Sequence, residues 1–285
     1  MSLVKTKKYQ TRCAVLVLAL ISNTSIAMAE FNNGALVLDA ICDDAVPASI
    51  FELGWLNETN GTKNIYYMNN DGDVSALTRD APALKNIDNL RVINHGHCGG
   101  VGDMTSQEFA TNLNKSYAPE APFEVELTTC DGGSQGMNSP ARVLSAEFKG
   151  KSKIMGWDGS VSLIGNGNIF LEDQQFGLQA DEVNQDWLNE RNVYAENIIA
   201  RWDKDSDAAY NQHTCERRLE AALLNPNEND FMNFVRDTVN YYSSPLAVEE
   251  KFSVPVARSF TLQKGRTVCG LMVKKITGKD CITAE

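Results

Sequence analysis

The sequence predicts an α/β fold with a mostly parallel β-sheet flanked by helices, followed by a C-terminal α+β region. Two observations lead to this prediction. Over the first half of the chain, short apolar runs bounded by turn residues alternate with segments of helical periodicity, which is the pattern of βαβ units. From about Asp181 the pattern changes to consecutive amphipathic helices and then to strand-like runs.

Four apolar runs are expected to form strands of the sheet, and one or two more follow them. Because helical segments separate several of these strands, right-handed crossovers would make the sheet mostly parallel. The four runs are GALVLDAIC (34–42), NIYYMN (64–69), LRVIN (90–94) and FEVELTT (123–129), and the later ones are KIMGW (153–157) and SVSLIG (160–165).

Two helices between these strands carry start signals. The segment 105–113 has Thr105 as N-cap and Glu108 three residues later, which matches a capping box. The segment 139–148 has Ser139 as N-cap and Pro140 at its first helical position. A further segment, 47–56, is expected to be a helical or irregular crossover.

The second half predicts an α+β region. An amphipathic helix is expected around Trp187 and Trp202, with both rings in a core, and two further helices over 215–224 and 229–242. Strands over 251–262 and 266–276 would then form a β-hairpin about the Lys264-Gly265 turn. Whether this region packs on the first sheet stays open at this point.

The N-terminus predicts a signal peptide over residues 1–29. A basic start is followed by the apolar run CAVLVLALI and by Ala27-Met28-Ala29, a small-x-small cleavage pattern before Glu30. The apolar run is too short to span a bilayer. We therefore expect a secreted or periplasmic protein without membrane association after cleavage, with a core over 30–180 and a C-terminal region over 181–285.

Six cysteines follow the expected cleavage site, and they allow up to three disulfides in an oxidising compartment. Spacing alone leaves their pairing open, although Cys269 and Cys281 are close enough to close a small loop. If one cysteine is a catalytic thiol, a second must also remain unpaired. The six are Cys42, Cys98, Cys130, Cys215, Cys269 and Cys281.

The formal net charge of −11 disfavours nucleic acids and anionic membranes as partners, because both are recognised by clustered Lys and Arg. We expect neither as a partner of the processed chain.

The segment RVINHGHCGG (91–100) is the first that indicates chemistry. One predicted strand ends at His95-Gly96, and a later one delivers Cys130. In open parallel sheets, such residues gather at the carboxyl ends of the strands, and these two strands would be neighbours if a right-handed crossover connects them. A thiol and an imidazole there can act as nucleophile and base, with the backbone N–H groups of Gly96 and Cys130 facing a developing oxyanion.

The order of these segments resembles the caspase-like (clan CD) cysteine peptidases, and is most similar to the cysteine protease domains of large bacterial toxins. The likeness covers about residues 35–170. It is carried by VINHGHCGGVGDMTSQEFATNL, VELTTCDGG and IMGWDGSVSL.

The resemblance implies a caspase-like sheet and a hydrolase, a cysteine endopeptidase that acts on a protein or peptide without a cofactor or metal. In that case His95 is the base, Cys130 the nucleophile, and Gly96 with Cys130 the oxyanion hole. Trp157 and Asp158 would line the substrate pocket, where Asp158 would suit a basic residue. Such a protein would act as a bacterial effector or toxin, or would process itself.

Three features depart from the family pattern. His97 and Cys98 follow the His-Gly pair, and Thr128-Thr129-Cys130 replaces the Q-A-C-x-G box of caspases. The toxin domains are activated by inositol hexakisphosphate on a basic patch, and this acidic sequence offers no obvious one.

Three alternatives use the same residues. His95, His97, Cys98 and Cys130 have the ligand atoms for a tetrahedral zinc site, although the spacing of known zinc motifs is absent. A Cys98–Cys130 disulfide would make Cys130 structural or would lock a zymogen until reduction. The protein would then be a disulfide-stabilised binding protein or a redox-controlled enzyme.

Two weaker signals lie in the second half. The segment 203–214 begins like a calcium loop, but Ala208 and Thr214 stand where Gly and Glu are needed, so a solvated turn is expected. For His213 we expect an exposed or capping role.

Overall fold

The computed structural model describes residues 31–43, 48–58, 61–134, 136–159, 161–163, 169–171, 202, 209–225, 230–243 and 266–283. The predicted signal peptide, Trp187, the predicted strand over 251–262 and the start of the calcium-like segment lie outside these residues. The described residues from Asn32 onward belong to one compact unit.

The centre of this unit is an eight-stranded sheet with the order β13-β12-β9-β8-β4-β1-β2-β3. The five central strands, from β9 to β2 in this order, are parallel to one another. Strands β12 and β13 at one edge and β3 at the other extend the sheet in antiparallel fashion. The predicted mostly parallel α/β sheet is confirmed. The bounds are β1 Asn33–Leu38, β2 Asn64–Met68, β3 Val74–Ala76, β4 Asn89–Ile93, β8 Glu124–Thr128, β9 Lys153–Trp157, β12 Arg266–Cys269 and β13 Cys281–Thr283.

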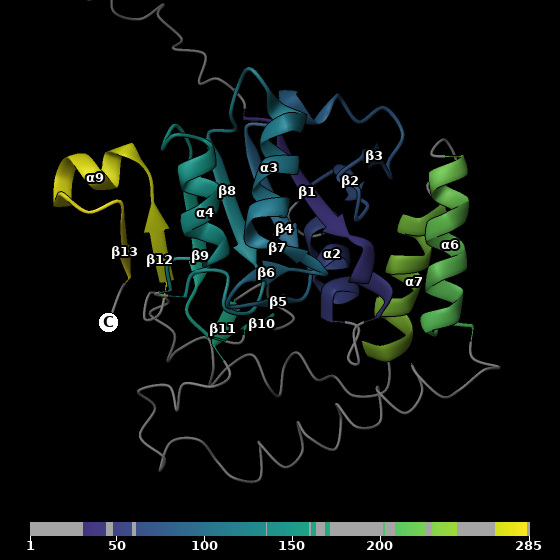
Figure 1. The fold of residues 1–285 in the computed structure, drawn as a ribbon. Helices are drawn as coiled ribbons and strands as arrows, with labels where there is room; N and C mark the ends of the chain where they lie inside the picture. The colour runs from purple at the N-terminus through teal and green to yellow at the C-terminus, as the bar shows by residue number, and fades with distance from the viewer. Residues whose placement is uncertain are drawn as a thin grey trace, which may run out of the picture. The chain divides into compact units, whose positions relative to one another are not determined.

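Both faces of the sheet are covered, as the continuous apolar runs require. In β1, Leu36 and Leu38 face one hydrophobic core, while Ala35 and Val37 face the other. Helices α3 (Ser106–Tyr117) and α4 (Pro140–Glu147) cover the first face and lie side by side in Figure 1. On the second face lie helices α2 (Ala48–Glu58), α6 (Gln212–Leu224) and α7 (Asp230–Ser243).

The capping signals have different outcomes at the two predicted helix starts. At α3 the box is confirmed: Thr105 Oγ1 accepts from the Glu108 N–H at 3.2 Å, and Glu108 accepts from the Thr105 N–H at 2.9 Å. At α4, Ser139 occupies the N-cap position but its side chain makes no capping hydrogen bond. The N–H of Ala141 already donates to the Gly132 carbonyl at 2.8 Å, so a preceding loop takes this role.

The end of the chain differs from the prediction. A strand was expected over 266–276, but β12 ends at Cys269 and helix α9 (Leu271–Thr277) follows. Gly270 makes the change of direction with φ 135°, a conformation that glycine adopts without strain. The chain then returns as β13, and Cys269 forms a disulfide with Cys281, so the predicted small loop is confirmed.

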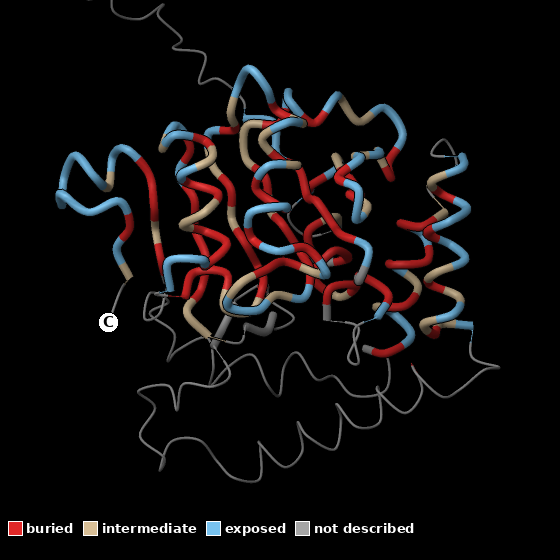
Figure 2. The backbone as a smooth tube through the Cα atoms, in the orientation of Figure 1, coloured by how far each residue is buried: buried red, intermediate tan, exposed pale blue. Residues whose placement is uncertain are grey.

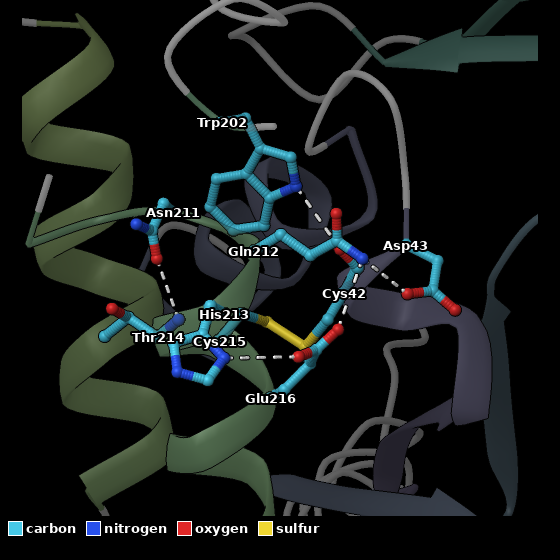
Figure 3. Close-up of a disulfide and its surroundings, with 9 residues drawn as sticks. All are labelled: Cys42, Asp43, Trp202, Asn211, Gln212, His213, Thr214, Cys215 and Glu216. Atoms are coloured by element: carbon cyan, nitrogen blue, oxygen red, sulfur yellow. Dashed lines mark hydrogen bonds and ion pairs between the residues drawn. A yellow bond between two sulfur atoms is a disulfide. The ribbon is translucent and has the colours of Figure 1, made fainter. Parts of the chain in front are cut away.

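A second disulfide joins Cys42 to Cys215 across 173 residues of sequence (Figure 3). It ties the 3₁₀ helix η1 (Asp39–Cys42), which follows β1, to helix α6. The buried indole of Trp202 donates to the Cys42 carbonyl at 3.2 Å, which confirms its predicted core position. The helices α6 and α7 of the C-terminal region therefore pack on the first sheet.

Two smaller expectations can be compared with this region. The His213 side chain is exposed, as predicted, with Nδ1 3.7 Å from the Glu216 carboxylate (Figure 3). Two disulfides fit an oxidising environment such as the periplasm or the cell exterior. Among the described residues, we find no helix with the length and apolar character needed to cross a membrane.

Candidate functional site

The candidate site begins with two neighbouring parallel strands, as expected. In the register of β4 and β8, Ile93 lies opposite Thr128. His95 and Cys130 each follow two residues after these paired strand ends, so both lie at the carboxyl edge of the sheet. The His95 side chain is exposed and that of Cys130 is half-buried.

The backbone brings the two segments into contact at Gly96. A Cβ atom on Gly96 would lie 2.5 Å from the carbonyl oxygen of Cys130 and 2.6 Å from Cβ of Thr129. Contacts this short are not tolerated between real atoms, so only glycine fits at this position. The His-Gly and Thr-Cys segments therefore meet through their main chains.

A small antiparallel sheet follows His95, where sequence analysis expected only a strand end. Its strands are β5 (Gly96–His97), β6 (Gly100–Val101) and β7 (Met104–Thr105). The N–H of Gly102 donates to the His95 carbonyl at 2.8 Å and holds the start of this sheet. The tight turn between β5 and β6 carries Cys98 at its tip.

The exposed thiol of Cys98 lies beside the Asp131 side chain, next in sequence to Cys130. The negative charge of Asp131 is the main cause that raises the pKa of Cys98, followed by desolvation and a hydrogen bond to the same carboxylate. Asp158 contributes in the same direction. Two carboxylates from different loops thus act on one thiol, a relationship that no spacing in the sequence indicates.

The loop after Cys130 is joined to the end of β9. Asp131 has φ 54°, and its N–H donates to the Gly159 carbonyl at 2.9 Å. The N–H of Gly133 donates to the Trp157 carbonyl at 2.7 Å, while the hydroxyl of Thr267 in β12 donates to the Gly133 carbonyl. Strand β12 therefore supports the loop that follows Cys130.

Glycines make this close packing possible. A Cβ on Gly133 would lie 2.5 Å from the carbonyl carbon of Gly156 in β9, and one on Gly132 would lie 2.6 Å from Oγ1 of Thr129. The predicted pocket residues follow directly after Gly156. Trp157 is buried with 4% exposure, whereas Asp158 is half-buried. Of the two, Asp158 is therefore the side chain within reach of a ligand.

Several buried hydroxyl groups belong to residues close to Cys130 in the sequence. Among the residues that the structure describes, they have no hydrogen-bond partner, although buried polar groups are usually paired. The sequence indicates Ser139 only as an N-cap and Thr128-Thr129 only as the residues before Cys130, and it gives no sign that these hydroxyls are buried without partners. The hydroxyls belong to Thr128, Thr129, Ser134 and Ser139.

The thiols and possible metal ligands are distributed as follows. Neither Cys98 nor Cys130 is part of a disulfide in this structure. The other four cysteines of the described region form the two disulfides. Within that region, no three side chains of His, Cys, Asp or Glu gather as a metal site would require. The zinc set of His95, His97, Cys98 and Cys130 is therefore not assembled.

Comparison with known proteins gives no match to any family model and none to any curated protein.

Proposed function

We propose that this protein is a cysteine endopeptidase on a caspase-like fold, with Cys130 as nucleophile and His95 as base. The backbone contact between Gly96 and Cys130 is the observation that supports the proposal most. It brings the segment that carries His95 and His97 next to the segment of Cys130, whose half-buried side chain is in no disulfide.

The proposed reaction proceeds through an acyl-enzyme. His95 accepts the proton of the Cys130 thiol as Sγ attacks the carbonyl carbon of the scissile peptide bond. The N–H groups of Gly96 and Cys130 donate to the oxyanion that forms. His95 then gives the proton to the departing amine as the C–N bond breaks. Water, deprotonated by His95, cleaves the thioester, and the proton returns to the thiolate.

The cysteine inventory supports this division of roles. If one of six cysteines is a catalytic thiol, a second must also lie outside the disulfides, and the described region holds two disulfides and two cysteines outside them. Because carboxylates raise the pKa of Cys98, this thiol stays protonated to higher pH than an ordinary cysteine, which weakens it as a nucleophile near neutral pH. Cys130 is therefore the thiol to which we assign catalysis.

The substrate class follows from the charges around the dyad. Asp131 and Asp158 both lie close enough to Cys98 to raise its pKa, so their carboxylates are on the same side of the site. A peptide with Lys or Arg before the scissile bond would place its cation near them. Asp158 is assigned as the specificity residue, and the buried Trp157 precedes it at the end of β9.

The two disulfides favour activity in an oxidising compartment. An endopeptidase exported to the periplasm or the cell exterior would act on foreign protein as an effector or toxin, or would cleave its own chain.

The test is iodoacetamide labelling of the native protein without reductant, followed by peptide mapping. We expect fast labelling at Cys130 that slows in the His95→Ala variant, while Cys98 in the same sample serves as the slow reference thiol. Equal labelling of Cys130 with and without His95 would overturn the dyad. Cys130→Ala should abolish cleavage with an unchanged fold, and Cys98→Ser should retain it.

A redox-locked form of the same enzyme is the second candidate. The specific observation in its favour is the contact of the Cys98 thiol with Asp131, the residue bonded to Cys130. A disulfide between the two thiols would block the nucleophile until reduction. Thiol titration of the unfolded, unreduced protein separates the cases: two free thiols favour the open enzyme, and none favours the locked form or a binding protein without chemistry.

A further inference from the structure

Helix α9 buries none of its side chains, although three of them are large and apolar. It links β12 to β13 and is closed at its base by the Cys269–Cys281 disulfide. Met272 and Ile276, four residues apart on one face, are 67% and 77% exposed, and Leu271 is 55% exposed. Figure 2 shows this segment as exposed along nearly its whole length. Helices of globular proteins normally turn such a face to the core.

Exposed lysines flank this apolar face. Lys274 is paired with Asp280 at 2.8 Å, but Lys275 and Lys279 form no ion pair with any described residue. The turn between α4 and β9 lies against the helix, because the Leu271 N–H donates to the Gly150 carbonyl at 3.0 Å. This turn adds two more exposed lysines without ion pairs to described residues, Lys149 and Lys151.

We propose that this surface docks on an anionic lipid bilayer. We name it the α9 patch, and it consists of Leu271, Met272, Ile276, Lys149, Lys151, Lys275 and Lys279. Apolar side chains that enter the interface, with lysines that meet anionic headgroups, are the composition of interfacial membrane elements. The patch is locally basic in a chain whose net charge is −11.

The composition favours lipid over a protein partner. The centres of protein–protein interfaces are enriched in aromatic residues, Met and Arg and depleted in Lys. The α9 patch shares only its Met with such a centre, because it has four lysines and neither an aromatic residue nor an Arg. The disulfide at the base of the loop holds these side chains together, so less conformational freedom is lost on docking.

The position of the patch is compatible with access to the candidate site. In the antiparallel pair β9–β12, Arg266 lies opposite Trp157 and Cys269 lies opposite Ile154. Because β12 ends beside the start of β9, helix α9, which follows β12, lies at the amino ends of the parallel strands. Cys130 lies at their carboxyl ends. Figure 1 shows α9 and the small sheet β5–β7 at opposite ends of the strands. A molecule docked through α9 would keep His95 and Cys130 on the side away from the lipid.

The net charge of the chain led us to expect no binding to anionic membranes. The net charge is a sum over the whole chain, so it hides a local group of lysines behind acidic residues elsewhere. Electrostatic attraction to headgroups acts over about 8 Å at physiological salt, so the charges nearest the bilayer decide binding. The proposal is independent of the proposed peptidase activity.

The test is co-sedimentation of the purified protein with vesicles of phosphatidylcholine and phosphatidylglycerol, compared with vesicles of phosphatidylcholine alone. We expect binding only to the mixed vesicles, with a loss at high salt. Replacing Met272→Ser together with Lys275→Glu should weaken binding about tenfold or more. The matched control, Leu224→Ser with Arg217→Glu, alters the same kinds of exposed side chain on α6 and should bind as the unmodified protein does.

A second variant, Lys149→Glu with Lys151→Glu, leaves α9 intact and should also weaken binding, so the proposal stays testable if the helix variant does not fold. No binding of the unmodified protein to mixed vesicles would overturn the proposal. An equal loss in the α6 control, or equal binding to both kinds of vesicle, would overturn it as well. Loss of self-association or of a protein contact in the α9 variant, with unchanged vesicle binding, would assign the patch to a protein partner instead.

Discussion

Gly96 and Cys130 are in main-chain contact, so closely that a side chain on Gly96 would lie 2.5 Å from the Cys130 carbonyl oxygen. This contact joins the segment after β4 to the segment after β8 across the carboxyl edge of the sheet. A backbone-to-backbone contact leaves little room for adjustment, because main-chain atoms cannot rotate away as a side chain can. The relative position of His95 and Cys130 therefore depends on a residue without a side chain.

We predict that Gly96→Ala displaces this contact and impairs activity more than folding. Relief of the overlap should cost about 1–3 kcal/mol of stability. The shift of the His95 segment should lower kcat/KM by about 100-fold, since a displacement on the order of 1 Å in a catalytic group has that effect. Urea unfolding and peptide cleavage assays measure the two effects separately.

Gly136→Ala is the matched control, because no atom lies within 4 Å of a Cβ at that position. It should change neither quantity noticeably. A Gly96→Ala variant with the same activity as the unmodified protein would contradict the role assigned to the contact.

The reactivity of Cys98 should depend on Asp131. The carboxylate disfavours the thiolate and so raises the pKa of Cys98, which means that alkylation of this thiol sets in at higher pH than for an ordinary cysteine. In Asp131→Asn this charge is lost, and Asn tolerates the positive φ of the position well. Iodoacetamide labelling across a pH series, in a Cys130→Ala background, should show the Cys98 profile shifted to lower pH.

The sign of the related stability effect follows from the same shift. Between the ordinary thiol pKa and the raised one, the folded protein keeps a proton that the unfolded chain has lost. The contribution of this group to stability is thus complete below the ordinary thiol pKa and decreases as the pH rises through the raised value.

An unchanged pH profile of Cys98 labelling in Asp131→Asn would show that a group other than Asp131 controls the thiol.

Asp158 should determine the preference for a cationic substrate. In Asp158→Asn we expect kcat/KM for a peptide with Arg before the scissile bond to fall by about tenfold, which corresponds to about 1.4 kcal/mol. A peptide with Leu at that position should be affected little. Asp71→Asn, at an exposed turn, serves as the charge-matched control. A loss that is equal for both peptides would assign Asp158 to structure instead of specificity.

The two disulfides should contribute unequally to stability. In the chain-entropy model, a link across 173 residues removes more freedom from the unfolded chain than one across 12. Replacing Cys42 and Cys215 by Ala should therefore cost about 5 kcal/mol, and replacing Cys269 and Cys281 by Ala about 3 kcal/mol. Urea unfolding of the two variants tests this order, and a reversed order would indicate that strain or residual structure dominates.

The sequence by itself determined the features that depend on neighbours along the chain. The parallel strands of the sheet, helices α3 and α4, and the capping box of Thr105 and Glu108 follow from periodicity and from hydrogen bonds within one turn. The Cys269–Cys281 link was predictable because its two residues are close in sequence. The alternation of strands and helices also predicted that β4 and β8 would be neighbours.

Only the tertiary structure decided the contacts between distant segments. The Cys42–Cys215 pair, the approach of Gly96 to Cys130 and the position of Cys98 beside Asp131 depend on which strand ends and loops meet. The exposed face of α9 likewise follows from the return of β13, which closes the loop outside the core. Periodicity specifies which side of a helix or strand is apolar. Which other segment packs against that side depends on the order of the strands and on the sharp turns at glycines, and this information is spread over the whole chain.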